Sequence, residues 1–522
     1  INGTQALTIT NTGAVALNGN VGASTALTSL SVSGASILGA NVTTSGTQTY
    51  TGAVTLSTSP TLTTTANTIT FSSSVNAVDA TDRDLTFATG TGTVTFTGAV
   101  GTTNNLGTIT NASGQQLTFS DAVTANTIAN YGTLLFQASS DKTVSAAITD
   151  NGTTTIQVIN SADDAPGIIT FSGNVAADTI TVGTTTKAGS AKFDGTVSGT
   201  NINIVGGNVI AEASLGNFAS TVTVTAITLD YNTAAATATF SGTAATITGT
   251  INGLATTEGT ITVSGTGKTF ASVIGGSSKP LATININAGT TTFDSAVTAT
   301  TVNAYAASTF TGAVTATTFA TSAAAYNIAI NGGGTITNVA TFSNTGTLTL
   351  AGTTTFTGGV TATAPSQVNI GGTVQSTNST ISIGDSDTPT VLTANTTISA
   401  GNGAITLGGT VNGAYTLDVN TTGTTTFSGV IGGSTPLTSV TTNTGGTVAI
   451  NTTAISTTGA QTFNENVTLG ADVTLTSSSS GNITFGGTIE STTSARALTV
   501  NTSGTTTFSG TVGATTPYLA SV

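Results

Sequence analysis

The chain has 522 residues, of which 7 are Lys or Arg and 20 are Asp or Glu, so that about 5% of it is charged and its formal net charge is −13 at pH 7. So few basic residues cannot form the positive stripe that neutralises phosphates, which excludes nucleic acid as a partner. The sequence contains no Cys, His, Met or Trp, which excludes disulfides, thiol nucleophiles, zinc fingers and every mechanism that uses an imidazole base.

Apolar residues are nevertheless frequent enough to form a buried core. The mean hydropathy is +0.28, whereas disordered chains combine low hydrophobicity with high net charge. No run approaches the ~18 consecutive apolar residues of a membrane-spanning helix, and no charged and apolar leader opens the chain. Because the first residue is Ile1, we expect a processed chain or an excerpt of a longer one.

Long repeats run along the whole sequence. Residues 419–436 return 81 positions later as residues 500–517, with 13 of 18 residues identical. Three further pairs of matching segments, in chain order, are 7–30 with 417–440, 48–56 with 461–469, and 272–281 with 429–437. Repeats of this kind predict a fold built from one recurring structural unit.

A shorter motif lies inside the long repeat. It consists of an apolar residue or Thr, then Thr, an aromatic residue, two or three small residues and a Val or Ile. Copies of the motif end at Val100, Val123, Val175, Val197, Val297 and Ile489. The alternation of β-branched or aromatic residues with Thr or Ser, bounded by Gly and Asn, predicts short strands with one buried face. No helical periodicity is present.

A strand unit of this size must stack on its neighbours to form a core, which predicts an all-β fold, a parallel β-solenoid (β-helix). Each coil would contain three short strands, paired with those of the next coil, and its Phe would stack on the next Phe inside. The length corresponds to roughly 24 coils of about 22 residues, spaced about 4.8 Å apart. We expect one continuous solenoid over residues 1–522, with an irregular zone near residues 211–260.

Four phrases carry a resemblance to a known family: "TTGAQTF", "GNITFGGTIEST", "ALTVNTSGTTTFSGTVGATTP" and "PLTSVTTNTGGTVAIN". They resemble the β-strand repeats of large bacterial surface proteins of the filamentous-haemagglutinin-like and autotransporter-passenger-like kind. The resemblance implies an exported protein, extracellular or at the bacterial cell surface, with a structural, adhesive or biofilm role.

Two functions follow as expectations. The first is a structural subunit of an extracellular fibre, sheath or surface layer. In this role the protein would form a rigid homopolymer, associating with other copies of itself head to tail or laterally. An open coil makes this possible because it presents unpaired backbone groups. The second is the stalk of a surface adhesin, whose ligand would be a glycan or a host surface. The sequence stops within a repeat at Val522, which favours a longer repetitive product. We predict no enzymatic activity, no catalytic or cofactor-binding residues and no transmembrane segment.

Clustered acidic residues are the only candidates for metal binding. Asp79, Asp82 and Asp84 lie near Arg83, and Asp385 lies near Asp387. Oxygen ligands in a turn can hold Ca²⁺, although solvated turn residues are the simpler interpretation and no calcium-binding nonapeptide is present. Asp163 and Asp164 form a further acidic pair.

Threonine patterns and glycosylation sequons complete the list. Asn41, Asn151, Asn395 and Asn466 begin N-x-S/T triplets, which a Thr-rich chain generates by chance. T-x-T triplets such as Thr93 to Thr95 could bind ice if one strand carried them in nearly every coil. The irregular offsets of the Thr runs favour β-propensity as the explanation.

Overall fold

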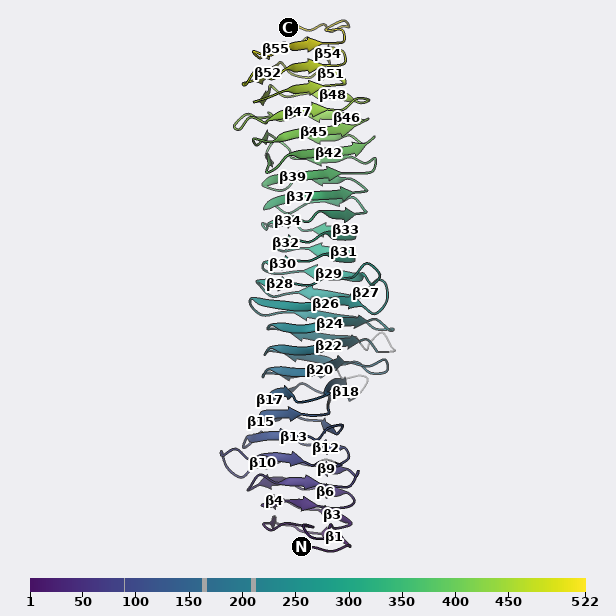
Figure 1. Cartoon of the computed structure of the whole chain (residues 1–522), viewed down its shortest axis with the longest axis vertical. Coiled ribbons are helices and arrows are strands. Elements are labelled where there is room, and N and C mark those ends of the chain that lie inside the picture. The colour runs from purple at the N-terminus through teal and green to yellow at the C-terminus, as the bar shows by residue number, and fades with distance from the viewer. Residues whose placement is uncertain (89, 162–166, 208–212) are drawn as a thin grey trace. The chain divides into compact units, whose positions relative to one another are not determined.

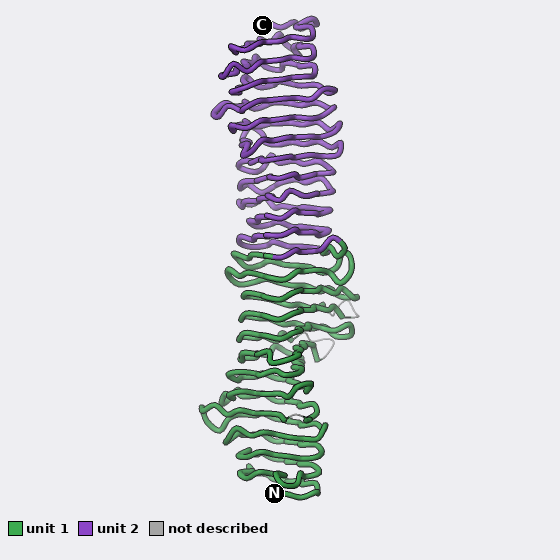
Figure 2. The backbone as a smooth tube through the Cα atoms, viewed as in Figure 1, with its two compact units in different colours: residues 1–271, 278–281 green, residues 272–277, 282–522 purple. Residues whose placement is uncertain are grey.

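The computed structural model describes residues 1–88, 90–161, 167–207 and 213–522. These residues form two compact units, one comprising residues 1–271 and 278–281 and the other residues 272–277 and 282–522 (Figure 2). The single continuous solenoid stays a prediction. Of the zone expected to be irregular, residues 211 and 212 lie outside the described residues, and the remainder includes the paired strands β23 (Ser214–Phe218), β24 (Val222–Asp230), β25 (Ala236–Phe240), β26 (Ala245–Gly253) and β27 (Glu258–Val263).

Each unit is a parallel β-solenoid, which confirms the predicted fold class. The described residues contain strands and no helix, and strands of successive coils pair in parallel (Figure 1). The coils number about 22, slightly fewer than predicted because loops lengthen several of them. The strands form because β-branched and aromatic residues alternate with Thr, so that one set of side chains points into the core and the other points outward.

In the first unit, the strands of successive coils build three faces. One coil consists of β6 (Gln48–Tyr50), β7 (Val54–Leu56) and β8 (Thr61–Thr63), and the next of β9 (Ile69–Phe71), β10 (Val75–Ala77) and β11 (Leu85–Phe87). These strands pair one to one along the three faces. We call the face of β6 and β9 the first face, that of β7 and β10 the second, and that of β8 and β11 the third.

An aromatic ladder fills the core behind the first face. Tyr50, Phe71, Phe96, Phe119 and Phe136 stack in sequence, with ring centroids 4.9 to 5.3 Å apart and ring planes inclined by 3 to 16°. All five side chains are buried. The predicted inward stack of one aromatic residue per coil is therefore confirmed over these coils.

The ladder then moves to another face. On the first face Phe136 pairs with Val158 of β18 (Thr155–Asn160), so no aromatic side chain continues the column. Phe171 instead pairs with Val144 on the second face, and a new stack of Phe171, Phe193, Phe218 and Phe240 begins there. The rings of Phe136 and Phe171 meet edge to face, with centroids 5.1 Å apart. The sequence motif has shifted by one side of the coil, a change that the repeat pattern did not predict.

The second unit follows the same plan. One set of its strands pairs in the order β37 (Thr347–Phe356), β39 (Gln367–Gln375), β42 (Thr396–Gly401), β45 (Thr416–Thr421), β47 (Ser439–Thr442), β50 (Gln461–Phe463), β53 (Ile483–Phe485) and β56 (Thr506–Phe508). Phe463, Phe485 and Phe508 stack along this set. Another set runs from β36 (Ala340–Thr341) to β54 (Ile489–Ser491).

Glycine occupies corners where the backbones of neighbouring coils approach closely. Gly101 has φ 68°, and a Cβ on it would lie 1.9 Å from the carbonyl oxygen of Thr124 in the next coil. Gly432 repeats this in the second unit, with φ 67° and Ser456 as its neighbour. Both positions need a residue that adopts positive φ and has no side chain.

Candidate functional site

The first acidic cluster lies in the turn between β10 and β11. Asp79 Oδ1 accepts hydrogen bonds from the hydroxyl and the amide of Thr81, the latter at 3.0 Å. The Arg83 guanidinium lies 3.6 Å from Asp79 Oδ2. These hydrogen bonds, and to a smaller extent Arg83, hold the pKa of Asp79 below its usual value. Asp79 therefore stabilises its own turn.

Asp84 ties three coils together instead of pointing toward Asp79. Its amide donates to Ser59 Oγ at 2.9 Å, and its Oδ1 accepts the amide proton of Thr108 at 2.7 Å. Asp82 is exposed on the same turn. The contacts of Asp79 and Asp84 are thus to neighbouring backbone and hydroxyl groups.

Asp385 and Asp387 share a tight turn of the second unit. Asp385 Oδ1 accepts the amide protons of Asp387 and Thr388, both at 3.0 Å. Within the described ranges, no three acidic side chains form a group that could hold a metal ion. Asp163 and Asp164 lie outside those ranges, and calcium binding stays a prediction.

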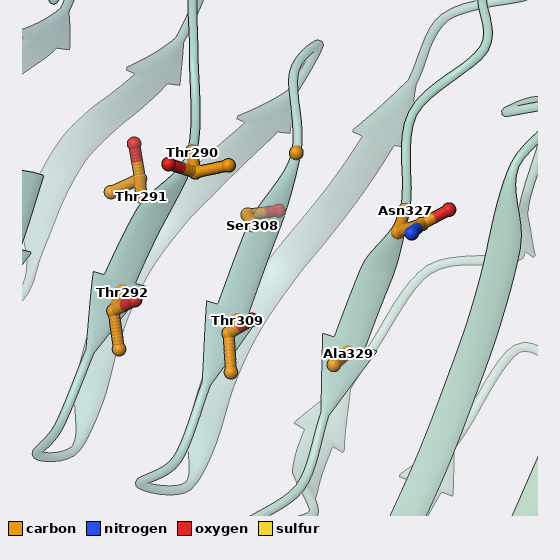
Figure 3. A pocket seen from close by; sticks show the side chains of 8 residues that line it. Thr290, Thr291, Thr292, Ser308, Thr309, Asn327 and Ala329 are labelled. Carbon is orange, nitrogen blue, oxygen red and sulfur yellow. The ribbon is translucent and has the colours of Figure 1, made fainter. Parts of the chain in front are cut away.

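A small pocket opens beside three aligned strands of the second unit, β30 (Thr291–Phe293), β32 (Ser308–Phe310) and β34 (Ile328–Ile330) (Figure 3). Its volume is about 190 Å³, below the roughly 300 Å³ at which pockets begin to accept small-molecule ligands. The hydroxyls of Thr291 and Ser308 are buried beside it without a hydrogen-bond partner. The pocket has room for a few water molecules but carries no charged group.

A larger pocket of about 460 Å³ lies in the first unit near Tyr131 and Phe87. Its buried amide, Asn111, is already used within the fold: Oδ1 accepts the Tyr131 amide proton at 2.7 Å, and Nδ2 donates to Asn130 Oδ1 at 3.0 Å. This side chain therefore fixes the turn and has little capacity left for a ligand.

In the part of the chain that the structure describes, two charged side chains, Lys268 and Glu465, are buried in the core away from these pockets. Lys268 is 1% exposed, and its Nζ donates to the carbonyl oxygens of Thr243 at 2.7 Å and Ala219 at 3.4 Å. Burial lowers the pKa of Lys268. Glu465 is 3% exposed, and burial raises its pKa, an effect offset in part by Thr442 and Gly446. Neither of these two groups reaches the carboxylate with good hydrogen-bond geometry.

The most regular surface feature is a sheet of hydroxyl groups on the first face. It covers β1 (Ala6–Ile9), β3 (Ser29–Val32), β6, β9, β12 (Val94–Phe96) and β14 (Gln116–Phe119), which pair in this order and in register. Outward-facing positions form three columns, and Ser or Thr fills sixteen of the eighteen positions. The columns, which we call the hydroxyl array, are Ala6, Ser29, Thr47, Thr68, Thr93, Gln116; Thr8, Ser31, Thr49, Thr70, Thr95, Thr118; and Thr10, Ser33, Thr51, Ser72, Thr97, Ser120.

Over these six coils the Thr runs, whose offsets in the sequence are irregular, lie in register. Thr49, Thr70, Thr95 and Thr118 are unevenly spaced in the sequence, yet each pairs directly with the next. The differences in coil length are taken up by loops elsewhere in the coil. The pattern T-x-T-x-T/S at residues 47–51, 68–72 and 93–97 is the signal in the sequence that could have revealed the array. The array ends at the next coil after Thr118, where Leu135 occupies the middle column.

No protein-family model matches the chain, and neither a curated protein nor a solved structure shows a significant match to it. Among the described residues there is no helix with the length and apolar character needed to cross a membrane. The β-solenoid architecture agrees with the resemblance to repetitive surface proteins at the level of the fold.

Proposed function

We propose that the chain is a structural module of an extracellular bacterial fibre, sheath or surface layer. One observation carries this proposal: within each unit, coil after coil repeats the same parallel pairing over a continuous buried core. Adding a coil adds length and leaves the cross-section unchanged. Such a stack is suited to a mechanical role, since backbone hydrogen bonds and apolar contacts join every coil to the next.

The outward side chains support a location outside the cell. They are largely Thr, Ser and Asn, and the 522 residues contain 7 Lys or Arg, so the chain offers few sites to proteases that cut after basic residues. Strands as short as β9 and β12, which are paired on both sides, also leave little backbone accessible to a protease. Both features suit a protein that must persist at a cell surface.

We further propose that copies of the chain associate with one another head to tail or laterally. The pairing that joins coils within a unit is generic, since it uses backbone groups, and the same groups at an exposed coil can pair with another chain. A contact of this kind between unlike surfaces extends without closing.

Electron microscopy at rising protein concentration tests the proposal. Filaments whose length increases with concentration are expected for a self-associating structural module. Single particles of constant length at all concentrations would contradict self-association and favour the other role of a stiff solenoid, the stalk of an adhesin.

A further inference from the structure

We propose that the hydroxyl array binds the surface of an ice crystal. It is a binding surface for ordered water, separate from any role in fibre formation. Its central part consists of three coils that carry nine hydroxyls: Thr47, Thr49, Thr51, Thr68, Thr70, Ser72, Thr93, Thr95 and Thr97.

The first argument for ice binding is the spacing of the hydroxyls. Ring centroids behind these coils lie 5.1 and 4.9 Å apart, which gives the repeat from coil to coil. Along a strand, outward residues recur about every 6.6 Å. The first repeat is about a tenth longer, and the second about a tenth shorter, than the oxygen–oxygen repeats along the two axes of a prism face of hexagonal ice. Hydroxyls on this grid can therefore hydrogen-bond to water molecules at their lattice positions.

The second argument is the flatness of the array. Most β-sheets twist, so that their surface would diverge from a crystal plane after a few strands. The planes of Tyr50, Phe71, Phe96 and Phe119 are inclined to each other by 9, 5 and 3°. These rings lie directly behind the array, and their small inclinations show that the side chains of successive coils keep nearly the same orientation. A regular stack of this kind favours a flat surface over the coils that carry the central hydroxyls.

Backbone pairing keeps the grid in place on both sides of the middle column. The amides of Gln48 and Ile69 donate to the carbonyl oxygens of Thr68 and Thr93, both at 3.1 Å. On the other side, Thr51, Ser72 and Thr97 each donate their amide proton to the preceding coil at 2.9 Å. The hydroxyls are thus mounted on a rigid frame.

The hydroxyls are also available to an external partner. None of the nine central side chains forms a side-chain hydrogen bond within the described part of the protein. Thr51, Ser72 and Thr97 are exposed, and Thr49, Thr70 and Thr95 are half-buried between their neighbours. The eighteen positions include no charged residue, and the nine central positions are all Thr or Ser, so the central surface presents hydroxyl and methyl groups alone.

The extent of the array matters because each water-mediated contact is weak and many must form together. Six coils at the observed repeat and three columns give a patch of about 25 by 13 Å. A free polypeptide loop or a single hydrogen-bonding group could be satisfied by any part of this patch. An ordered lattice is the partner that can engage many of these groups at once.

The test is adsorption of the fluorescently labelled chain to a single growing ice crystal, with inhibition of ice recrystallisation as a second readout. We expect adsorption to defined crystal planes. The double substitution Thr70→Tyr and Thr95→Tyr should lower the adsorbed amount at least tenfold, because two large side chains then stand above the plane.

The matched control is Thr406→Tyr with Thr426→Tyr. These residues are also half-buried and pair directly on adjacent coils of the second unit. Ala404 and Gly408, which lack hydroxyls, flank Thr406, whereas Thr424 and Ser428 flank Thr426, so the three-column hydroxyl pattern does not continue from one of these coils to the other. The control should adsorb as the unmodified chain does. Circular dichroism establishes that both variants are folded.

Several results would overturn the proposal. They are failure of the unmodified chain to adsorb to ice, equal loss in both variants, full adsorption by the Thr70 and Thr95 variant, or binding to microcrystalline cellulose in place of ice. Adsorption of the unmodified chain without a preferred crystal plane would also contradict it, and this readout does not depend on the folding of any variant.

Discussion

Gln48 and Gln461, which belong to different units, hold their buried side-chain amides in the same way. Nε2 of Gln48 donates to the Thr63 carbonyl oxygen at 2.8 Å. Nε2 of Gln461 donates to the Thr476 carbonyl oxygen at 2.9 Å. Each amide also donates to the carbonyl six residues before it and to the Thr hydroxyl four residues before it. The long sequence repeat therefore preserves a buried polar network as well as the apolar core.

Substituting Gln48→Leu should lower the stability of the first unit by about 1 to 3 kcal/mol, because carbonyl groups that the amide satisfies would stay buried without a donor. Gln116→Leu is the matched control, since Gln116 is half-buried on the surface of the array. Urea unfolding followed by circular dichroism measures the difference. Equal effects at the two positions would show that the buried network contributes nothing specific.

Replacing one ring of the aromatic ladder should be costly. Phe96 is fully buried between Phe71 and Phe119, and Phe96→Ala should destabilise its unit by about 3 to 5 kcal/mol through lost burial and an unfilled cavity. The neighbouring Thr95 points outward, so Thr95→Ala should change stability by less than about 1 kcal/mol. Amide hydrogen exchange around β9 and β14 should accelerate in the first variant alone.

Stability should fall as pH rises through the titration of Glu465. Burial raises the pKa of this carboxyl, so the folded state prefers the protonated form. Its contribution is present in full below the pKa of the unfolded chain and is lost as pH rises through the folded pKa. Glu465→Gln should therefore stabilise the second unit at pH 8 and have little effect at pH 4. Denaturation midpoints at both pH values would test this, and an equal shift at each would contradict it.

Substitutions at two glycines distinguish the effect of a steric clash on stability from the effect of a positive φ angle. Gly101 and Gly114 have similar φ values of 68° and 71°, but a Cβ on Gly114 would meet no atom within 4 Å. Gly114→Ala should cost about 1 kcal/mol for the left-handed conformation alone. Gly101→Ala should cost clearly more, because its Cβ would clash with the Thr124 carbonyl and separate the coils. Thermal melts of the two variants provide the comparison.

The sequence predicted the strands, their inward aromatic residues and the parallel stack, because alternation and repetition are local properties that any coil displays. It did not predict the change of face between Phe136 and Phe171, since the motif itself is unchanged on either side. It also missed the register of the hydroxyl array, because spacing in the sequence mixes strand positions with loop lengths. Buried Gln48 and Glu465 were missed for a different reason: such side chains normally lie at the surface.

The change of face after Phe136 has a consequence for how such a gene can grow. A duplicated segment that contains a whole number of coils lengthens the stack and leaves every later residue on its original side. A segment one side longer or shorter also folds, but it turns the motifs that follow to the adjacent side, as the stack from Phe171 to Phe240 demonstrates. Unequal recombination can therefore move surface residues to another side of the coil without a single substitution. The length of the inserted segment then determines at which coil a functional face begins and ends.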